Sequence, residues 1–224
     1  MLIYIPIGGI LNNKNDMEAI KSIKKRYSGE SKNSCNLSCG SNIDFLAIKN
    51  GELLLDIGCG RGNESIEAAL KAGPEGKVIG LDVTREMIEK ARENALNSGV
   101  SNIDFVEGEI ECLPFDKNTF NAVMSNCAIN HALNKKKAFK EIFRVLRKGG
   151  RFVISDAVTM SPLPPSIKND PEARAQCFGG AVTEKEYLDS IKRSGFKDTR
   201  IVSKRTYKKN GYDFASITLI AYKQ

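Results

Sequence analysis

The chain has 224 residues, of which 41% are hydrophobic and 27% charged, which is typical of a globular protein with one α/β domain. Its net charge of +7 is spread over many segments and is not interleaved with aromatic side chains, so a nucleic-acid partner is not expected. No apolar run approaches the ~20 residues of a membrane span, and nothing resembles a secretory leader. We therefore expect a cytoplasmic protein with no membrane partner, whose cysteines are reduced and bind or react.

The N-terminal part differs in character from the rest. Residues 1–11 are apolar and β-branched, which fits an edge strand, a mobile arm or an extension upstream of Met17. From Met17 to Tyr27 apolar residues recur at intervals of three and four, which predicts a helix. Residues 28–42 are rich in Gly, Ser and Asn, which predicts a loop or lid. That lid carries two cysteines, Cys35 and Cys39.

From Leu53 onward, strand and helix patterns alternate. Strands are predicted at 53–57, 77–82, 103–106, 120–125 and 151–156, and helices at 63–72, 85–98, 135–146 and 184–194. Thr84 is placed to cap one helix, and Thr183 with Glu186 to form a capping box before another. A proline-bearing excursion, 158–182, precedes an antiparallel pair at 201–207 and 214–221.

Repeated strand–helix units predict a mostly parallel, seven-stranded sheet with helices on both faces and an antiparallel C-terminal pair. This is an α/β fold of the Rossmann-like class. We divide the chain into an N-terminal arm, helix and lid, residues 1–50, and a single globular domain, residues 51–224.

The stretch Leu53 to Gly62 predicts a small-molecule site. A buried apolar strand is followed by glycines at every second position, which allow positive φ and close approach of a ligand at the carboxyl edge of the sheet. A dinucleotide dehydrogenase would have glycine where this chain has Asn63. Asp82 ends the next strand and can accept hydrogen bonds from both ribose hydroxyls of an adenosyl group. With Asp56 before the glycines, this pattern resembles the S-adenosylmethionine-dependent methyltransferases of the Rossmann-like class.

That resemblance implies a pocket for S-adenosylmethionine. Glu109 follows the third strand and either contacts the exocyclic amine of adenine or is an exposed loop residue. Met87 either stacks on the adenine or packs in the core, and Arg61 either neutralises the cofactor carboxylate or faces solvent. The residues predicted to bind the cofactor are Asp56, Gly58, Cys59, Gly60, Asp82, Val83, Met87, Gly108, Glu109, Ile110 and Asn126.

The positions of the cysteines point to the methyl acceptor. Cys127 comes directly after the fourth strand, where acceptors meet the methyl donor, and Cys177 lies in an excursion that can fold over the same opening. With a thiol from the lid, three sulfur atoms could converge, which suits a soft, thiophilic centre. Cys59 and Cys112 are interpreted as small buried apolar residues. Zinc is a poorer alternative, because there is no C-x-x-C pair and the only histidine, His131, is better placed as a helix-end or pocket-lining residue.

A closer resemblance covers about Leu53 to Thr199. Segments around Glu93, 108–111, 155–156, 162–164 and 169–171 read in order like the arsenite methyltransferases, and the most specific are Ser-Asn-Cys-x-Ile-Asn at 125–130 and Cys-x-Gly-Gly-Ala at 177–181. The resemblance implies that Cys127 and Cys177 bind trivalent arsenic, with Cys39 or Cys35 as third ligand. The family usually has Asn-Leu-Ser-Pro where this chain has 130–133, Asn-His-Ala-Leu, and its members commonly carry a further C-terminal domain.

The reaction implied is methylation of arsenite or methylarsenite, with a role in arsenic detoxification. Thiolates would hold As(III) as a pyramidal complex whose lone pair attacks the sulfonium methyl, so no general base is needed. A thiol reductant such as thioredoxin or glutathione is a further candidate partner. Two alternatives stay open: methylation of a small, quinone-type organic acceptor, and a non-catalytic arsenic- or metal-binding protein on the same fold.

Overall fold

The computed structural model describes residues 14–31 and 42–224. Residues 1–13 and 32–41, with the predicted N-terminal arm, Cys35 and Cys39, lie outside the described residues. The strands are β1 (Leu53–Ile57), β2 (Lys77–Asp82), β3 (Ile103–Glu107), β4 (Phe120–Asn126), β5 (Leu146–Thr159), β6 (Lys197–Lys209) and β7 (Tyr212–Tyr222). The helices are α1 (Lys14–Glu30), α2 (Ile43–Leu46), α3 (Asn63–Ala72), α4 (Arg85–Asn97), α5 (Lys135–Val145), α6 (Pro165–Lys168), α7 (Pro171–Ala175) and α8 (Glu184–Lys192), with short 3₁₀ turns η1 (Ile129–His131) and η2 (Phe178–Gly180).

The described strands form one seven-stranded sheet in the order β3-β2-β1-β4-β5-β7-β6. The first five strands in this order are parallel to one another, and β7 pairs antiparallel with both β5 and β6. The predicted fold class is therefore confirmed. The strand order reverses between β1 and β4, where Ile57 pairs with Ser125, and at such a switch point the connections leave a crevice beyond the carboxyl ends of the strands.

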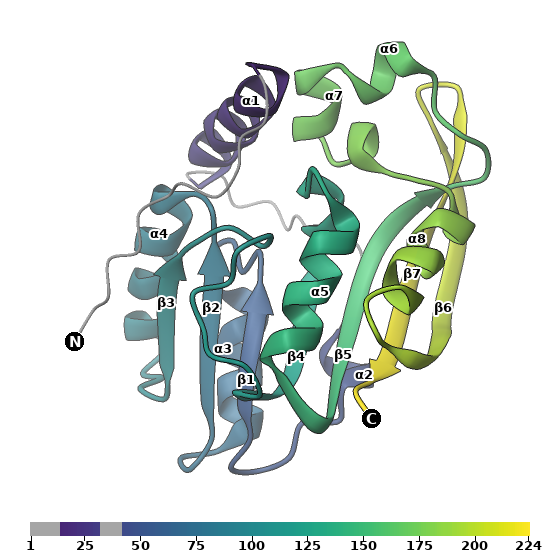
Figure 1. Cartoon of the computed structure of the whole chain (residues 1–224). Coiled ribbons are helices and arrows are strands. Elements are labelled where there is room, and N and C mark those ends of the chain that lie inside the picture. The colour runs from purple at the N-terminus through teal and green to yellow at the C-terminus, as the bar shows by residue number, and fades with distance from the viewer. Residues whose placement is uncertain (1–13, 32–41) are drawn as a thin grey trace.

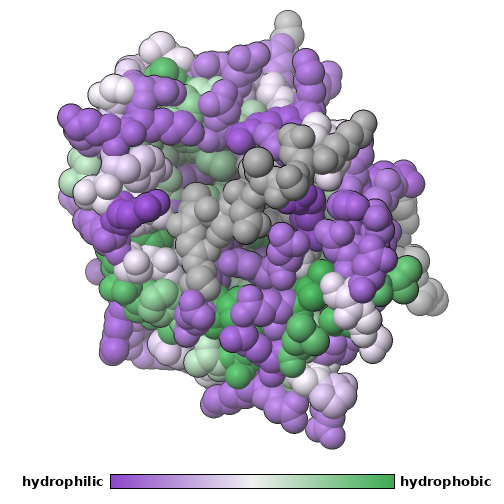
Figure 2. Space-filling view, turned by 180° about the vertical axis from the view of Figure 1, so that it is seen from behind, coloured by the Kyte–Doolittle hydropathy of each residue, from purple (hydrophilic) through white to green (hydrophobic). Residues whose placement is uncertain are grey.

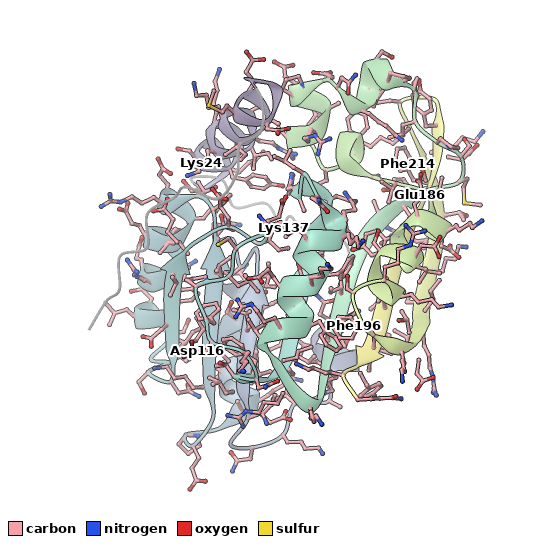
Figure 3. The ribbon with its side chains drawn as sticks, in the orientation of Figure 1. Lys24, Asp116, Lys137, Glu186, Phe196 and Phe214 are labelled. Atoms are coloured by element: carbon pink, nitrogen blue, oxygen red, sulfur yellow. The ribbon has the colours of Figure 1, made fainter. Side chains whose placement is uncertain are left out.

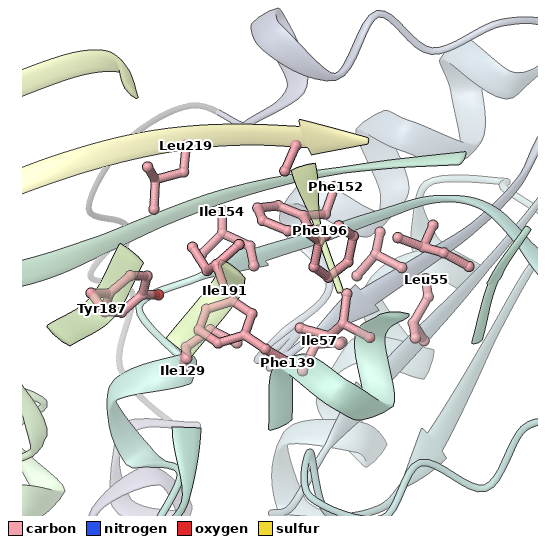
Figure 4. Close-up of a cluster of buried hydrophobic side chains, with 14 of the residues drawn as sticks. Leu55, Ile57, Ile129, Phe139, Phe152, Ile154, Tyr187, Ile191, Phe196 and Leu219 are labelled. Atoms are coloured by element: carbon pink, nitrogen blue, oxygen red, sulfur yellow. The ribbon is translucent and has the colours of Figure 1, made fainter. Parts of the chain in front are cut away.

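Helices cover both faces of the sheet (Figure 1). Consecutive residues of a strand point to opposite faces, so Leu55 joins one cluster of buried apolar side chains with α5 and α8, while Leu54 joins another with α3 and α4. Figure 4 shows the first cluster, in which Phe139 of α5 and Tyr187 of α8 pack over β5. Burial on both faces explains why the strands read as continuous apolar runs.

Most predicted boundaries agree with the structure, including the capping box in which Glu186 N–H and Thr183 Oγ1 are 3.3 Å apart. The predicted cap at Thr84 is confirmed in position but not in its side-chain hydrogen bond. Thr84 occupies the N-cap position, but its hydroxyl makes no cap bond, because the N–H of Met87 donates to the main-chain oxygen of Thr84 instead. Strand β5 is longer than predicted, because β7 pairs with it as far as Thr159.

The 160–182 excursion forms α6, α7 and η2, which lie with α1 above the carboxyl ends of the strands (Figure 1). Helix α1 is tied to α7 by a hydrogen bond of 2.6 Å from Arg26 Nη1 to the carbonyl of Ala175. The face seen in Figure 2 is largely hydrophilic, with smaller apolar areas. Within 14–31 and 42–224, no helix combines the length and the apolar character needed to cross a bilayer.

Candidate active site

The turn after β1 has a fixed conformation. Gly58, Gly60 and Gly62 all have positive φ, and the N–H groups of Gly58 and Cys59 donate to the carbonyl of Leu81 at 2.7 and 3.0 Å. A Cβ on Gly58 would lie 2.3 Å from the Cβ of Ala128, the residue after Cys127. Only glycine therefore lets the turn pass so close to the end of β4.

Three carboxylic acids surround this turn. The Asp82 carboxylate accepts hydrogen bonds from the N–H groups of Gly60 at 3.0 Å and Thr84 at 2.8 Å, and its burial raises its pKa. Asp56 accepts a hydrogen bond from the Ser65 hydroxyl, and burial, followed by the nearby charge of Glu64, raises its pKa to about 8. Burial also raises the pKa of Glu64, whose Oε1 accepts from Asn126 Nδ2 at 3.1 Å. Burial therefore disfavours the ionised forms of all three acids, and a cationic ligand bound here would favour them.

These residues line one cavity at the switch point. It includes all the predicted cofactor residues except Glu109: Asp56, Gly58, Cys59, Gly60, Asp82, Val83, Met87, Gly108, Ile110 and Asn126. Glu109 instead pairs across an isolated β-bridge with Cys112, so a contact of Glu109 with adenine has no support from the cavity. Arg61 lines the cavity and does not simply face solvent, and the side chain of Met87 is fully buried in its wall.

The structure brings Cys127 and Cys177 together. Cys177 Sγ lies 3.5 Å from the main-chain oxygen of Cys127, at the edge of the cofactor cavity that Cys127 lines. Both have positive φ, 59° at Cys127 and 66° at Cys177, and Cys177 is the centre of a tight turn in which Phe178 N–H donates to the Gln176 carbonyl at 2.8 Å. In the described ranges, the only other residue with positive φ besides Gly, Asn and Asp is Ala47. Strained residues of this kind cluster at functional sites.

The cysteines differ in oxidation state. Cys127 is disulfide-bonded, which differs from the expected reduced state, whereas Cys59, Cys112 and Cys177 are free. Cys127 must therefore be reduced before it can act as a thiolate ligand. Cys59 is buried, as predicted, but Cys112 is exposed, because it lies on the irregular surface connection after β3. The predicted third ligand, Cys39 or Cys35, is outside the described residues.

Two polar side chains hold the Cys177 thiol. Its Sγ lies 3.0 Å from Nε2 of His131 and 3.4 Å from the hydroxyl of Tyr27, and that hydroxyl lies 2.9 Å from the same Nε2. Burial raises the pKa of Cys177 to about 11 and lowers that of His131 to about 3, so a thiol faces a neutral imidazole at pH 7. His131 ends η1 and lines the cavity, which confirms the interpretation drawn from the sequence.

Comparisons with known proteins agree with this geometry. The methyltransferase-domain family matches residues 48–195. The chain belongs to the methyltransferase-domain family. S-adenosylmethionine, the predicted cofactor, is the cofactor of this family and fold.

The relatives of this methyltransferase domain include arsenite methyltransferases. It is 41% identical over 168 residues to the arsenite methyltransferase of Halobacterium salinarum, covering 75% of this chain and 43% of that protein. It superposes on the crystal structure of an arsenic(III) S-adenosylmethionine methyltransferase from Chlamydomonas reinhardtii with a TM-score of 0.73 and 27% identity, covering 92% of this chain and 73% of that one. A ubiquinone/menaquinone biosynthesis C-methyltransferase of Salmonella arizonae is 34% identical over 113 residues, half of this chain and 45% of that protein. The predicted resemblance is confirmed, and the methyltransferase domain spans less than half the length of these two curated relatives.

The residues of the methyltransferase domain fit S-adenosylmethionine. The cofactor carries a sulfonium and an ammonium group, and a cationic ligand favours the carboxylate forms of Asp56, Glu64 and Asp82, whose pKa values burial raises. Asp82, held by two backbone N–H groups, retains acceptor capacity for the ribose hydroxyls. Met87 and Ile110 add apolar wall to the cavity.

Several lining residues of the methyltransferase domain were not predicted from the sequence. Glu64 stands in the first turn of α3, where acidic residues are common in any helix, so its position carried no distinct signal. Ile23 and Tyr27 come from α1, more than thirty positions before the glycine turn, and only the packing of α1 brings them to the cavity. Nothing local to residues 17–27 indicates that contact.

Proposed function

We propose that this methyltransferase transfers a methyl group from S-adenosylmethionine to trivalent arsenic held by Cys127 and Cys177, with arsenite and methylarsenite as substrates. The observation that carries the proposal is the 3.5 Å separation of Cys177 Sγ from the Cys127 carbonyl, beside the cofactor cavity. Two cysteines held in strained backbone conformations favour a role beyond filling space. The similarity to arsenite methyltransferases supports the same assignment.

The methyl transfer itself needs no general base. Each sulfur–arsenic bond forms as one arsenic–hydroxyl bond breaks, and the thiol proton leaves with the hydroxide as water. S-adenosylmethionine supplies an electrophilic methyl carbon on a sulfonium. The task of the chain is therefore to hold the metalloid at the mouth of the cavity with its lone pair facing that carbon.

Two further parts belong to this proposal. The third thiol is Cys39 or Cys35. A thiol reductant, such as thioredoxin or glutathione, would reduce the disulfide at Cys127, because an oxidised sulfur offers no thiolate to arsenic. A cytoplasmic location would supply such a reductant.

The test is incubation of the reduced protein with methyl-labelled cofactor and a panel of acceptors containing arsenite, methylarsenite and a quinone. We expect label in methylated arsenicals, and a loss of at least about 100-fold in Cys177→Ser and Cys127→Ser, because a hydroxyl is a poor ligand for a soft centre. Cys112→Ser is the matched control, since this exposed cysteine lies outside the cavity.

Other outcomes identify the alternatives. Label found only in the quinone would show that the methyl acceptor is an organic molecule and not arsenic. Arsenic binding that needs both cysteines, with no label transferred to any acceptor, would indicate a binding protein. Full arsenic methylation by Cys177→Ser would contradict the proposed site.

A further inference from the structure

A second cavity of about 430 Å³ lies between the start of α5, the η2 turn, and helices α7 and α8. It shares no lining residue with the cofactor cavity. Figure 3 marks its surroundings with Lys137 in the first turn of α5 and Glu186 in the first turn of α8. The proposed methyl transfer uses none of the charged residues in its wall.

The wall carries an excess of positive charge. Two acids line it, Glu186 and Asp189, against five cations, Lys135, Lys136, Lys168, Arg174 and Arg193. Among the described residues, none of the five cations takes part in an ion pair. The Glu186 carboxylate is already engaged, because its Oε2 accepts from both the N–H and the hydroxyl of Thr183 at 3.0 and 2.9 Å. Among the side chains of the wall, cations therefore exceed acids by three.

The base of the cavity is closely packed. Lys135 Nζ donates to the carbonyl of Gly180, which uses one of its three N–H donors. Gly180 is locked against the neighbouring η1 turn, because a Cβ there would lie 1.8 Å from the carbonyl oxygen of Asn130. Lys135 is also the first residue of an eleven-residue helix, whose N-terminal end favours negative charge.

The acids near Lys135 do not neutralise it fully. The closest in electrostatic influence is Asp156, which is completely buried and already accepts hydrogen bonds from the Ala157 N–H and the Tyr187 hydroxyl at 2.9 and 3.1 Å. Burial lowers the pKa of Lys135 to about 8, a shift that Asp156 and Glu111 only partly offset. An anion in the cavity would restore the missing compensation.

We propose that this cavity is a binding site for a small anion carrying two or more negative charges, held by Lys135 at the base and by Lys168, Arg174 and Arg193 around it. A multivalent anion contacts several of these cations at once, whereas a monovalent one satisfies a single cation and leaves the others uncompensated. Phosphate-type and carboxylate-type anions share this chemistry. The proposal is independent of arsenic methylation, because none of these residues belongs to the cofactor cavity or to the thiol pair.

The test is titration calorimetry of the whole chain at low salt with pyrophosphate, citrate and acetate in separate arms. We expect saturable binding of pyrophosphate or citrate that weakens as salt is added, and the stronger of the two identifies the anion class. Lys168→Gln with Arg193→Gln should weaken binding about tenfold, since two partly exposed charge contacts are removed. Both side chains lie near the surface, so the variant is expected to fold, and its melting temperature without anion checks this.

The matched control is Lys197→Gln with Arg205→Gln, which removes the same charge from exposed positions on β6. It should alter affinity by less than about twofold. If both double variants bind the anion equally weakly, the effect comes from general surface charge and the proposal is overturned. Acetate binding as tightly as the multivalent anions, or no saturable heat from either, would also overturn it. Because the readout is binding, failure of arsenic methylation leaves this result unaffected.

Discussion

The cofactor cavity and the thiol pair meet at one edge of the sheet but are built in different ways. About half of the cofactor cavity's lining comes from β1, the glycine turn, the first turn of α3 and the end of β2, which are close in sequence. The thiol site joins Tyr27, Cys127, His131 and Cys177, and the contact between Tyr27 and Cys177 spans 150 positions. The first region is set by local backbone conformation, and the second by the packing of distant segments.

The two regions also differ in where they place backbone strain. Positive φ in the cofactor turn falls on glycines, which adopt it freely. At the thiol site it falls on the two cysteines themselves, at a cost of about 1–3 kcal/mol each. Substitutions in the cofactor turn should therefore mainly change cofactor affinity. Substitutions at the thiol site should also change the free energy of unfolding.

The largest expected effect is a loss of cofactor binding with arsenic binding retained. In Asp82→Ala, affinity for S-adenosylmethionine should fall roughly 100-fold, because hydrogen bonds to a charged acceptor contribute about 1.5–3 kcal/mol each. Arsenic binding, measured separately, should be unchanged. Glu109→Ala removes the same charge outside the cavity, and its affinity should stay near that of the unmodified protein. Equal losses of cofactor affinity in the two variants would show that Glu109 also contacts the cofactor.

A second prediction concerns the support of the thiol loop. Gly180→Ala should lower the free energy of unfolding by about 2 kcal/mol, because the new methyl group meets the carbonyl of Asn130 and the η2 turn must shift. Gly29→Ala is the control: it lies exposed in α1 with open space around it, so the same change should be neutral or stabilising by up to about 1 kcal/mol. Urea unfolding of both variants measures the difference, and a loss in Gly29→Ala equal to that in Gly180→Ala would contradict the explanation.

A third and smaller effect isolates the strain at Cys177. Both Cys177→Gly and Cys177→Ala remove the thiol and should abolish arsenic binding at this position. Only glycine relieves the positive φ, so Cys177→Gly should be more stable than Cys177→Ala by about 1 kcal/mol. Equal unfolding free energies would show that the turn has little strain.

The same contrast explains what the sequence could predict. The glycine turn, Asp56 and Asp82 were predictable because each follows directly from a strand end, and the positions of strand ends are set by local apolar patterns. Cys127 was predictable for the same reason, since it follows β4. Its contact with Cys177 was only an expectation, because no local pattern fixes how a proline-bearing excursion folds back.

Other features depend on contacts that no single segment contains. In the sequence, the residues around His131 are typical of a helix end, which suits a structural role. Only the placement of α1 and η2 puts its ring beside Tyr27 and Cys177. The second cavity has the same origin, because its cations come from α5, α6, α7 and α8. In the sequence these residues read as ordinary solvated charges.

The smallest expected effect is a pH dependence confined to the cofactor side. The folded pKa of Asp56 is raised to about 8, so the folded protein without cofactor binds a proton there that the unfolded chain, with its ordinary pKa of 3.8, has released at neutral pH. That proton contributes stability that is complete below pH 3.8 and is lost as pH rises through about 8. A cationic cofactor favours the carboxylate, so binding should release the proton, and affinity should rise from pH 6 to pH 8 by less than about tenfold per pH unit.

Calorimetry at pH 7 in buffers of different ionisation enthalpy measures that release directly. Asp56→Asn should bind without the Asp56 proton release and with a flatter pH profile, whereas Glu109→Gln should keep both. Release that persists in Asp56→Asn would assign the proton to Glu64 or Asp82, whose pKa values are also raised by burial. Arsenic binding should not follow this profile, because Asp56 is buried and its carboxylate accepts a hydrogen bond from Ser65 of α3.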